Sequence, residues 1–351
     1  LSILQLAVRS NFNFVYSPIS IWIMLAAIAE GADLGTQQKL FQLLNLPNDP
    51  CIRQAFYQLA TTRSIPSNEV NIKSTRALLI DERSTLNPYW YEFVVRNALL
   101  DVITAPIKYN PVATTNEIKR IMSAQLPRLD LTGNSVLLDT MDYNGLWTTA
   151  FADATIERAP FYNMEGEQIG AVDLMRVKRR ARMGYLKRLN AKILELPIGS
   201  DSRYRMLFCV IIANNDITPV VKAVNRDLVF EMISTLRESY VQIDMAIPRM
   251  VITSEVDVRA ILEDLGVTDL WTDPAPAAFP SSFVQRSTVV LNNTGLYLPP
   301  LEQDPPYGTR TGLEPILGRD FIADRPFLFG LFDAETYTSL LAAGYTRPTY
   351  M

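Results

Sequence analysis

The chain has 351 residues, 48% of them hydrophobic, and a formal net charge of -4. This size allows a large buried core, and the acidic balance argues against bulk nucleic-acid binding, which leaves a basic footprint. The absence of histidine excludes a Ser-His-Asp or Cys-His catalytic arrangement and a histidine-based zinc site. No apolar run approaches the roughly 20 residues of a membrane span. No carboxylate pair stands out, so we expect a protein that is not an enzyme and needs no metal or cofactor.

The two cysteines give no sign of a disulfide framework. Cys209 lies in the apolar run of residues 206–213, whose length is typical of a buried strand, so we expect a packed thiol. The sequence begins at Leu1 rather than at a methionine and has no signal-peptide pattern. We therefore expect a processed or truncated form.

Helices are predicted mainly in the first third of the chain. Ser17 and Pro18 are typical of a helix start, and apolar residues nearly surround the following helix, which should be central and buried and should end near Gly31. A short helix should follow a Thr36 cap. Later, Ser254 and Asp257 form a capping-box pattern before a helix that Gly266 should end.

Strands are predicted in the rest of the chain, at residues 136–138, 241–245 and 327–332. Helices followed by strands favour a mixed α+β fold over a regular βαβ repeat. No linker, repeat or low-complexity tract divides the sequence.

A series of short motifs along the chain resembles the serpin family. In order, they are Asn13 to Ser20, Gly31-Ala32 with Thr36, Asp139 to Phe151 (with Tyr143, Gly145 and Trp147), Glu195-Leu196-Pro197, Ile247-Pro248-Arg249, Leu265-Gly266-Val267, Phe321 to Phe329, and Gly344 with Pro348. Each motif alone is weak, but the ordered set covers almost the whole chain. The resemblance implies a single domain over residues 1–351, with three β-sheets, about eight or nine helices and an exposed reactive loop at about 296–318.

The resemblance also implies a function. In an inhibitory serpin, a protease cleaves the exposed loop, which then inserts as a new central strand and traps the enzyme. We therefore expect a secreted, monomeric protein whose partner is a protease, with no nucleic acid and no membrane.

The expected hinge of the loop departs from the family pattern of small residues. Only Gly295 matches, and it is followed by Leu296, Tyr297, Leu298, Pro299, Pro300, Leu301 and Glu302. The two prolines cannot donate ladder hydrogen bonds, and burial of Glu302 without a partner is costly. We expect a stiff loop that stays largely expelled from the sheet.

The family's central shutter is altered as well. Ser17 and Ser20 match it, but Asp139 stands at the position of its asparagine and Gln285 at that of its histidine. Two interpretations remain. The Gln285 amide donates to Asp139 in a substituted network, or the pair reflects drift in a protein no longer selected for sheet opening.

Two bonds of the loop suit different proteases. Tyr307-Gly308-Thr309 offers an aromatic residue to papain-like cysteine proteases, whereas Arg310-Thr311 suits trypsin-like serine proteases. The sequence is similar to divergent insect serpins of the silk-gland type that are directed at cysteine proteases, so we favour the first. The rival hypothesis is a non-inhibitory serpin, a carrier, chaperone or storage protein; a carrier should have an apolar pocket away from the loop.

Two surface features stay open. The basic residues Arg176, Lys178, Arg179, Arg180 and Arg182 suit sulfated glycans, but they straddle an expected hairpin, where a solvated face is the simpler interpretation. Asn292-Asn293-Thr294 is a glycosylation sequon on the strand that enters the loop, where we expect it to be too buried for use.

Overall fold

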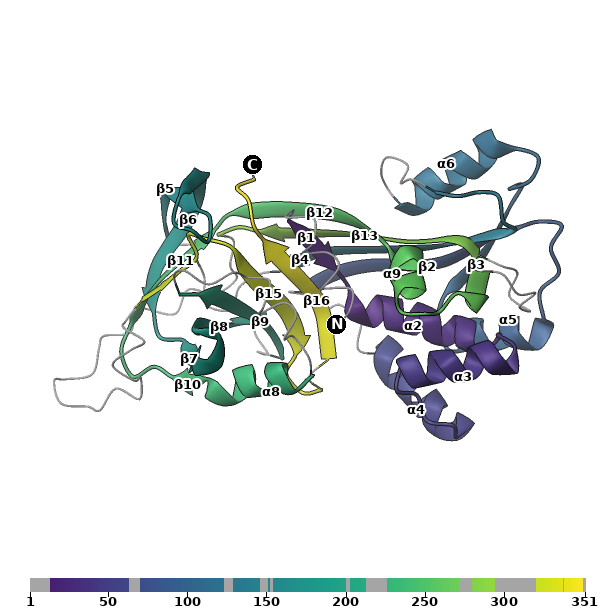
Figure 1. The fold of residues 1–351 in the computed structure, drawn as a ribbon, viewed down its shortest axis with the longest axis horizontal. Helices are drawn as coiled ribbons and strands as arrows, with labels where there is room; N and C mark the ends of the chain where they lie inside the picture. Colours follow the sequence, from purple (N-terminus) through teal and green to yellow (C-terminus); the bar gives the residue numbers. More distant parts are fainter. Residues whose placement is uncertain are drawn as a thin grey trace.

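The computed structural model describes residues 13–62, 70–122, 129–145, 151, 154–199, 203–212, 226–271, 280–293, 320–336 and 338–349. This part of the chain contains three β-sheets and seven α-helices (Figure 1). The helices are α2 (Pro18–Ala29), α3 (Leu34–Leu43), α4 (Pro50–Thr62), α5 (Pro88–Arg96), α6 (Pro111–Met122), α8 (Arg226–Thr235) and α9 (Val258–Asp264), and two 3₁₀ turns span Lys187–Leu189 and Asp269–Trp271.

The three sheets differ in length and connectivity. The five-stranded sheet has the order β12 (Met250–Asp257), β13 (Pro280–Leu291), β4 (Ser135–Gly145), β2 (Val70–Asp81) and β3 (Asp101–Ala105). The four-stranded sheet has the order β14 (Asp320–Ile322), β11 (Ile243–Pro248), β6 (Gln168–Arg179) and β5 (Thr155–Tyr162). The seven-stranded sheet has the order β1 (Phe14–Tyr16), β16 (Thr338–Tyr345), β15 (Phe327–Asp333), β9 (Tyr204–Ile211), β8 (Ala191–Ile198), β7 (Arg182–Leu186) and β10 (Arg237–Glu238).

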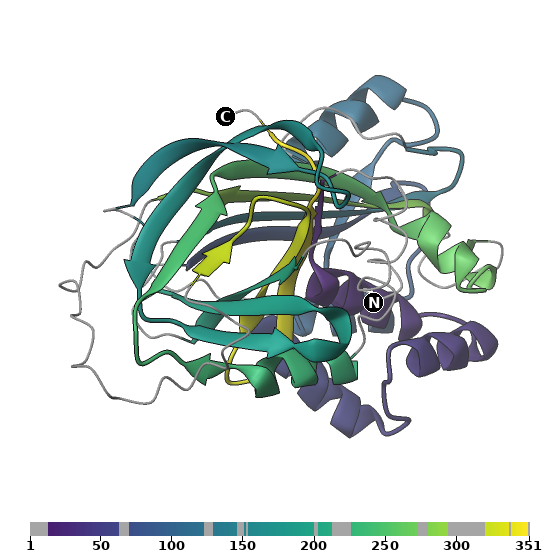
Figure 2. The same ribbon diagram turned by 60° about the vertical axis from the view of Figure 1, so that its left-hand side comes forward.

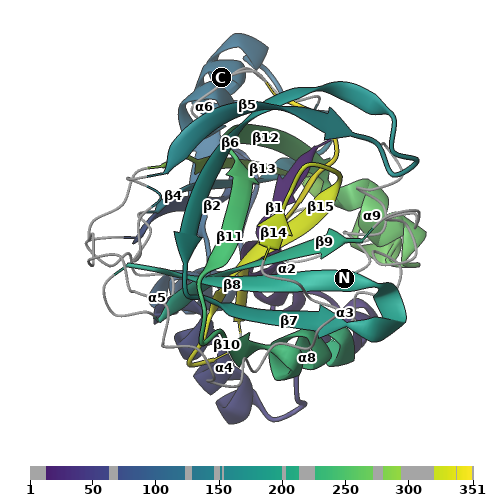
Figure 3. The ribbon, with the colours of Figure 1, turned by 90° about the vertical axis from the view of Figure 1, so that its left-hand side faces the viewer.

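Helices α2 to α5 and the four-stranded sheet lie at opposite ends of the molecule. Figure 1 shows α2 to α5 gathered at one end, and β5, β6 and β11 at the other. Figure 2 shows the N-terminal helices, in purple, beside the stacked strands. Figure 3 looks onto the far end, where β5, β6 and β11 stand in front and α8 runs along β7 and β10. The predicted α+β class with three sheets is confirmed; the eight or nine expected helices compare with seven in the described residues.

The first helix confirms its prediction. Ser17 is the N-cap of α2, Pro18 fills the first helical position, and Gly31 follows the C-cap residue Glu30. Most of α2 is buried, including Ile23, which is fully buried. A helix that is apolar on all sides can only be accommodated inside a large core, and α2 lies in the cluster that also holds side chains of α3, α4 and α5.

Two predicted helix starts are wrong in detail. Asp33, not Thr36, caps α3, because its carboxylate accepts from the N–H groups of Gly35 and Thr36. Asp257, not Ser254, caps α9. Ser254 lies within β12 instead, where its hydroxyl accepts from the backbone N–H of Val15 at 2.9 Å. A contact across 239 residues therefore occupies the hydroxyl that the local pattern assigned to a cap.

A second core lies between the sheets. Aromatic rings of β9, β15 and β16 meet there, with centroid distances of 5.9 Å between Phe208 and Phe329 and 5.5 Å between Phe327 and Tyr345. The predicted strand at 327–332 is confirmed as β15 and faces this core. Among the described residues, none of the helices has the length and apolar composition that a membrane-spanning helix requires.

Candidate functional site

The N-terminus of α2 carries two of the four residues expected in the shutter. The Ser17 hydroxyl accepts from the backbone N–H of Ser20 at 3.4 Å. It also donates to the backbone carbonyl of Leu340 in β16 at 2.8 Å. Pro18 needs no partner, since it has no N–H to satisfy. The capped end of the helix is therefore tied to the seven-stranded sheet.

The other two residues, Asp139 and Gln285, face each other on neighbouring strands. β4 and β13 run parallel, and their register pairs Asp139 with Gln285. The Gln285 amide nitrogen donates to one carboxylate oxygen of Asp139 at 2.5 Å, and the Ser20 hydroxyl donates to the other at 2.7 Å. The structure thus brings all four residues together, and the substituted Gln–Asp hydrogen bond is present.

Gln285 also bonds to the backbone at the start of α2. Its amide oxygen accepts from the Ser17 N–H at 2.8 Å, and its amide nitrogen donates to the Ser17 carbonyl at 3.1 Å. Because a buried polar group without a partner costs about 1–3 kcal/mol, these contacts hold the amide in one orientation. We call Ser17, Ser20, Asp139 and Gln285 the polar clamp; it joins α2, β4, β13 and β16.

Asp139 is the acidic member of the polar clamp and is fully buried. Burial raises the pKa of Asp139 to about 6, while the hydrogen bonds from Gln285 and Ser20 and the charge of Arg76 partly oppose the rise. Arg76 of β2 is its register partner, but that guanidinium donates to the backbone carbonyl of Leu99 at 3.0 Å. Among the described side chains, the carboxylate thus has two neutral donors and no cation in an ion pair.

The polar clamp lies midway along a continuous parallel ladder. The pairing of β4 with β13 runs from Ser135 opposite Pro280 to Tyr143 opposite Val289, with one irregularity near Pro280. We call this ladder the β4–β13 seam. Because the facing backbone groups are already paired, a further strand can enter only after the seam separates.

The hinge and reactive residues expected in the loop lie outside the described residues. They are Gly295, Leu296, Leu298, Pro299 and Pro300 in the hinge, and Tyr307, Gly308, Thr309, Arg310 and Thr311 in the reactive segment; Trp147 lies outside as well. The flanking strands are described: β13 ends at Leu291 in the five-stranded sheet, and β14 begins at Asp320 in the four-stranded sheet.

Sequence reasoning missed an ion pair at the far end of this segment. The Lys192 ammonium donates to the Asp320 carboxylate at 2.6 Å and to the Asp320 backbone carbonyl at 3.0 Å. Lys192 lies on β8, and Asp320 is the first residue of β14. The pair therefore ties the chain after the expected loop to the seven-stranded sheet, a contact that neither residue's local sequence signals.

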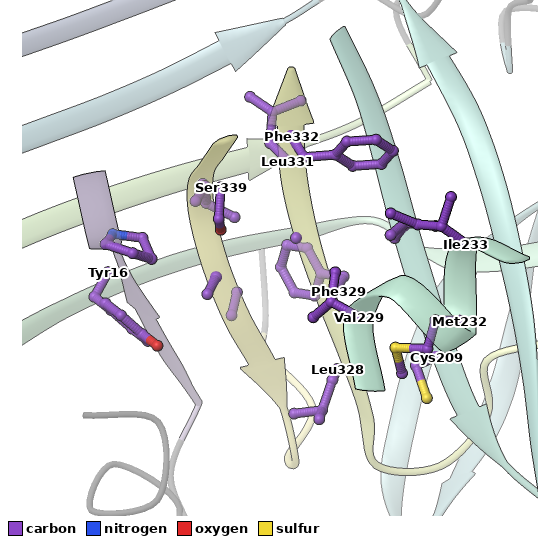
Figure 4. A pocket seen from close by; sticks show the side chains of 16 residues that line it. Tyr16, Cys209, Val229, Met232, Ile233, Leu328, Phe329, Leu331, Phe332 and Ser339 are labelled. Atoms are coloured by element: carbon purple, nitrogen blue, oxygen red, sulfur yellow. The ribbon is translucent and has the colours of Figure 1, made fainter. Parts of the chain in front are cut away.

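An apolar pocket of about 270 Å³ lies between α8 and the seven-stranded sheet (Figure 4). Strands β9, β15 and β16 form one wall, and Val229, Met232 and Ile233 of α8 face them. None of the lining residues belongs to β13 or β14, the strands that flank the expected loop. Sequence patterns do not reveal this pocket, because its lining residues come from five separate parts of the chain.

The pocket contains few polar groups and no charge. Its 16 lining residues include no Asp, Glu, Lys or Arg, and the side-chain polar groups are those of Tyr16, Cys209 and Ser339. Burial raises the pKa of the Cys209 thiol to about 12 and holds the pKa of Tyr16 well above its usual range, so both stay neutral at physiological pH. The pocket thus suits a small, uncharged and mostly apolar molecule.

The basic cluster has a different setting from the one expected. β6 ends at Arg179 and β7 begins at Arg182 in another sheet, so the expected hairpin is wrong. Arg176 forms an ion pair with Asp244 at 2.8 Å, and Arg182 one with Glu195 at 2.5 Å. These pairs occupy cationic groups that a glycan site would need.

Asn292 of the sequon is half-buried directly after β13. Both cysteines, Cys51 and Cys209, are free, and Cys51 is exposed. Within the described ranges, no group of three or more His, Cys, Asp or Glu side chains is arranged to hold a metal ion.

Comparisons with known proteins agree across the chain's length. The family model Serpin (serine protease inhibitor) matches residues 2–348. Serpin B5 of Xenopus laevis is 21% identical, covering 96% of this chain and 91% of its own. Human corticosteroid-binding globulin is 24% identical, covering 97% of this chain and 86% of its own. Uncleaved ovalbumin shares the fold with a TM-score of 0.83 at 19% identity, covering 99% of this chain and 97% of its own.

Proposed function

Because the chain belongs to the serpin family, we propose that it inhibits a protease by presenting the segment at about 296–318 as bait, with little or no loop insertion. The observation that carries the proposal is the closed β4–β13 seam with the polar clamp across it. Insertion must separate the seam and break the Gln285–Asp139 hydrogen bond. The residues of the expected hinge include two prolines without a backbone N–H donor and few small side chains, so they can replace few of these contacts.

The energetic balance follows from the hinge residues. Pro299 and Pro300 have no N–H to donate to either neighbouring strand. Glu302 would have to enter the sheet with its charge or take up a proton. Each buried backbone group left without a partner costs about 1–3 kcal/mol. Insertion beyond Leu298 therefore loses ladder and clamp contacts without equivalent gains, and the loop stays expelled.

A stiff loop still suits inhibition by occupancy of a protease cleft. Prolines such as Pro305 and Pro306 reduce the freedom that the loop loses on binding, which lowers the entropic cost. We propose a papain-like cysteine protease as the target, with Tyr307-Gly308 at the cleft, and a secreted single-domain inhibitor without catalysis of its own. The alternative target is a trypsin-like protease that recognises Arg310.

The test is the residual activity of papain and of trypsin against a dilution series of the protein, followed by SDS gels of each mixture. We expect loss of papain activity without an SDS-resistant complex. Tyr307→Ala should weaken papain inhibition at least tenfold, which corresponds to a loss of about 1.4 kcal/mol of binding free energy. Arg310→Ala, in the same segment, should change papain inhibition by no more than about twofold.

Two outcomes would contradict the proposal. Loss of trypsin activity with a covalent band would show that the hinge does insert and that Arg310 is the bait. If an excess of the protein inhibited neither papain nor trypsin, the proposed inhibitory function would be wrong.

The pocket favours a second candidate, a carrier of small apolar molecules. A relative at 24% identity is named corticosteroid-binding globulin, and the pocket here is apolar and uncharged. Saturable binding of Nile red, a neutral apolar dye, would support this candidate. Val229→Phe should abolish it by filling the pocket, whereas Phe230→Leu, at an exposed position of the same helix, should not. Equal dye binding by both variants would exclude the pocket as its site.

A further inference from the structure

The polar clamp places a fully buried carboxyl group on the β4–β13 seam, which would have to separate before a further strand could enter the five-stranded sheet. Asp139 lies at the middle of the β4–β13 seam, and its two oxygens accept from Gln285 of β13 and Ser20 of α2. Separation of the seam would part Asp139 from Gln285 and admit water. The charge state of this one group therefore affects the closed sheet and the open sheet differently.

Few other charged groups surround Asp139. The sequence of α2 contains no ionisable side chain, and the chain has no histidine. On β2, the positive charge of Arg76 interacts electrostatically with Asp139 and also with Asp101 of β3. Along β4, Tyr143 is buried with its pKa raised, so it stays neutral. On β13, Arg286 follows Gln285 in the chain and pairs with Glu255 of β12 at 3.5 Å.

We propose that Asp139 is a proton-operated latch on the β4–β13 seam, holding the sheet closed when its carboxyl group is neutral and loosening it when the group ionises. Such a latch would control how readily the five-stranded sheet accepts a further strand, whichever protease the chain meets.

The hydrogen-bond geometry allows both charge states. With a neutral carboxyl, the oxygen near Ser20 can donate to the Ser20 hydroxyl while the other oxygen still accepts from Gln285, so the carboxyl group keeps both of its partners. With an ionised carboxyl, a full charge is buried with two neutral donors and no paired cation among the described side chains. Opening of the seam relieves that burial by admitting water.

The direction of the pH effect follows from the pKa. The pKa of Asp139 is about 6 in the closed sheet, against about 3.9 for an aspartate in water. The closed sheet therefore binds the proton more tightly. The stability that this proton adds to the closed sheet, relative to the open sheet, is fully present below about pH 4 and is lost as the pH rises to about 6. From pH 5 to pH 7.5, opening should become about tenfold more favourable.

A peptide-incorporation assay tests the latch directly. The probe is a fluorescent ten-residue peptide of alternating threonine and valine, which has no proline and can pair with both β4 and β13. Its rate of incorporation into the full chain is measured between pH 5 and pH 7.5. Asp139→Asn mimics the neutral carboxyl, and Asp142→Asn, at an exposed position of the same strand, is the matched control.

We expect incorporation into the wild type and the Asp142→Asn variant to be about tenfold faster at pH 7.5 than at pH 5. Asp139→Asn should be slow at both values. Equal pH dependence in wild type and Asp139→Asn would overturn the latch, and so would a pH-independent wild type.

A second measurement covers the case in which Asp139→Asn does not fold. Infrared difference spectra of wild-type protein with carboxyl-labelled aspartate should show a buried neutral carboxyl that forms below about pH 6, in step with the slowing of incorporation. Absence of that signal, or a signal that does not follow the rate, would overturn the proposal. Neither measurement involves a protease, so a failed latch and a failed inhibitor are distinguishable.

Discussion

At the scale of single residues, the Gln285 side chain makes three hydrogen bonds in the polar clamp, more than the side chain of any other member. Its amide bonds to both backbone groups of Ser17 and to the Asp139 carboxylate. Gln285, which we expect at the position of the family's histidine, joins its strand to the helix and to the neighbouring strand. Of the two interpretations of this pair, the substituted network is the one that predicts such a hydrogen bond between Gln285 and Asp139.

Removal of this amide should destabilise the protein. Gln285→Ala leaves Ser17 without two partners and Asp139 without one, so we expect a loss of about 3 kcal/mol in the free energy of unfolding at pH 7. Urea denaturation would measure it. Gln58→Ala, at an exposed position of α4, should stay within about 0.5 kcal/mol. A similar effect of both substitutions would contradict the role assigned to the polar clamp.

The two thiols should differ strongly in reactivity. Cys51 is exposed, whereas Cys209 is buried with its pKa raised to about 12, and the thiolate is the reactive form. With Ellman's reagent at pH 8, we expect one thiol per chain to react within minutes and the second only after denaturation. In Cys51→Ser, the fast phase should disappear. A fast phase that persisted in this variant would show that Cys209 is accessible through the pocket.

At the scale of secondary-structure elements, the position of α8 depends on a glycine of β7. A Cβ atom at Gly184 would lie 2.5 Å from the Thr235 hydroxyl oxygen and 2.9 Å from the Thr235 backbone carbonyl carbon. Thr235 is the last residue of α8. The helix approaches the strand this closely because no side chain stands between them, and the same helix forms one wall of the pocket.

Gly184→Ala should therefore displace α8. We expect a loss of about 1–3 kcal/mol in stability, typical of overpacking, and weaker Nile red binding as the pocket wall moves. Urea denaturation and dye titration would measure the two effects. Gly35→Ala, in the first turn of α3 where the nearest atom is the Asp33 carboxylate oxygen at 3.3 Å, should change neither by much. Unaltered stability of Gly184→Ala would contradict the close packing.

At the scale of the whole molecule, the five-stranded sheet has β4 and β13 as direct neighbours. A strand inserted between them would replace the one existing ladder with two and so raise thermal stability. The proposed expelled loop gives up that gain. We therefore expect protease nicking within 296–318 to raise the melting temperature by at most about 2–4 °C. In a large domain, a shift of this size corresponds to about 1 kcal/mol of stability. Calorimetry before and after nicking measures the change, and a much larger rise would show that the loop inserts.

The sequence by itself determined the fold class and the main buried helix. Ser17, Pro18 and the apolar residues of α2 act within a few positions of one another, so local chemistry was enough. The ordered motifs placed the family. Local patterns were less reliable where two residues could both cap one helix. Asp257 caps α9, because the Ser254 hydroxyl instead accepts a hydrogen bond from the backbone of β1.

Only the tertiary structure decided which distant groups share buried space. Asp139 and Gln285 are 146 residues apart, and the parallel register of β4 and β13 places them in contact. The pocket likewise exists only when α8 packs against three strands of one sheet. Periodicity and capping depend on neighbours in sequence, whereas burial, a raised pKa and a cavity depend on which surfaces meet, and these follow from the packing of the complete chain.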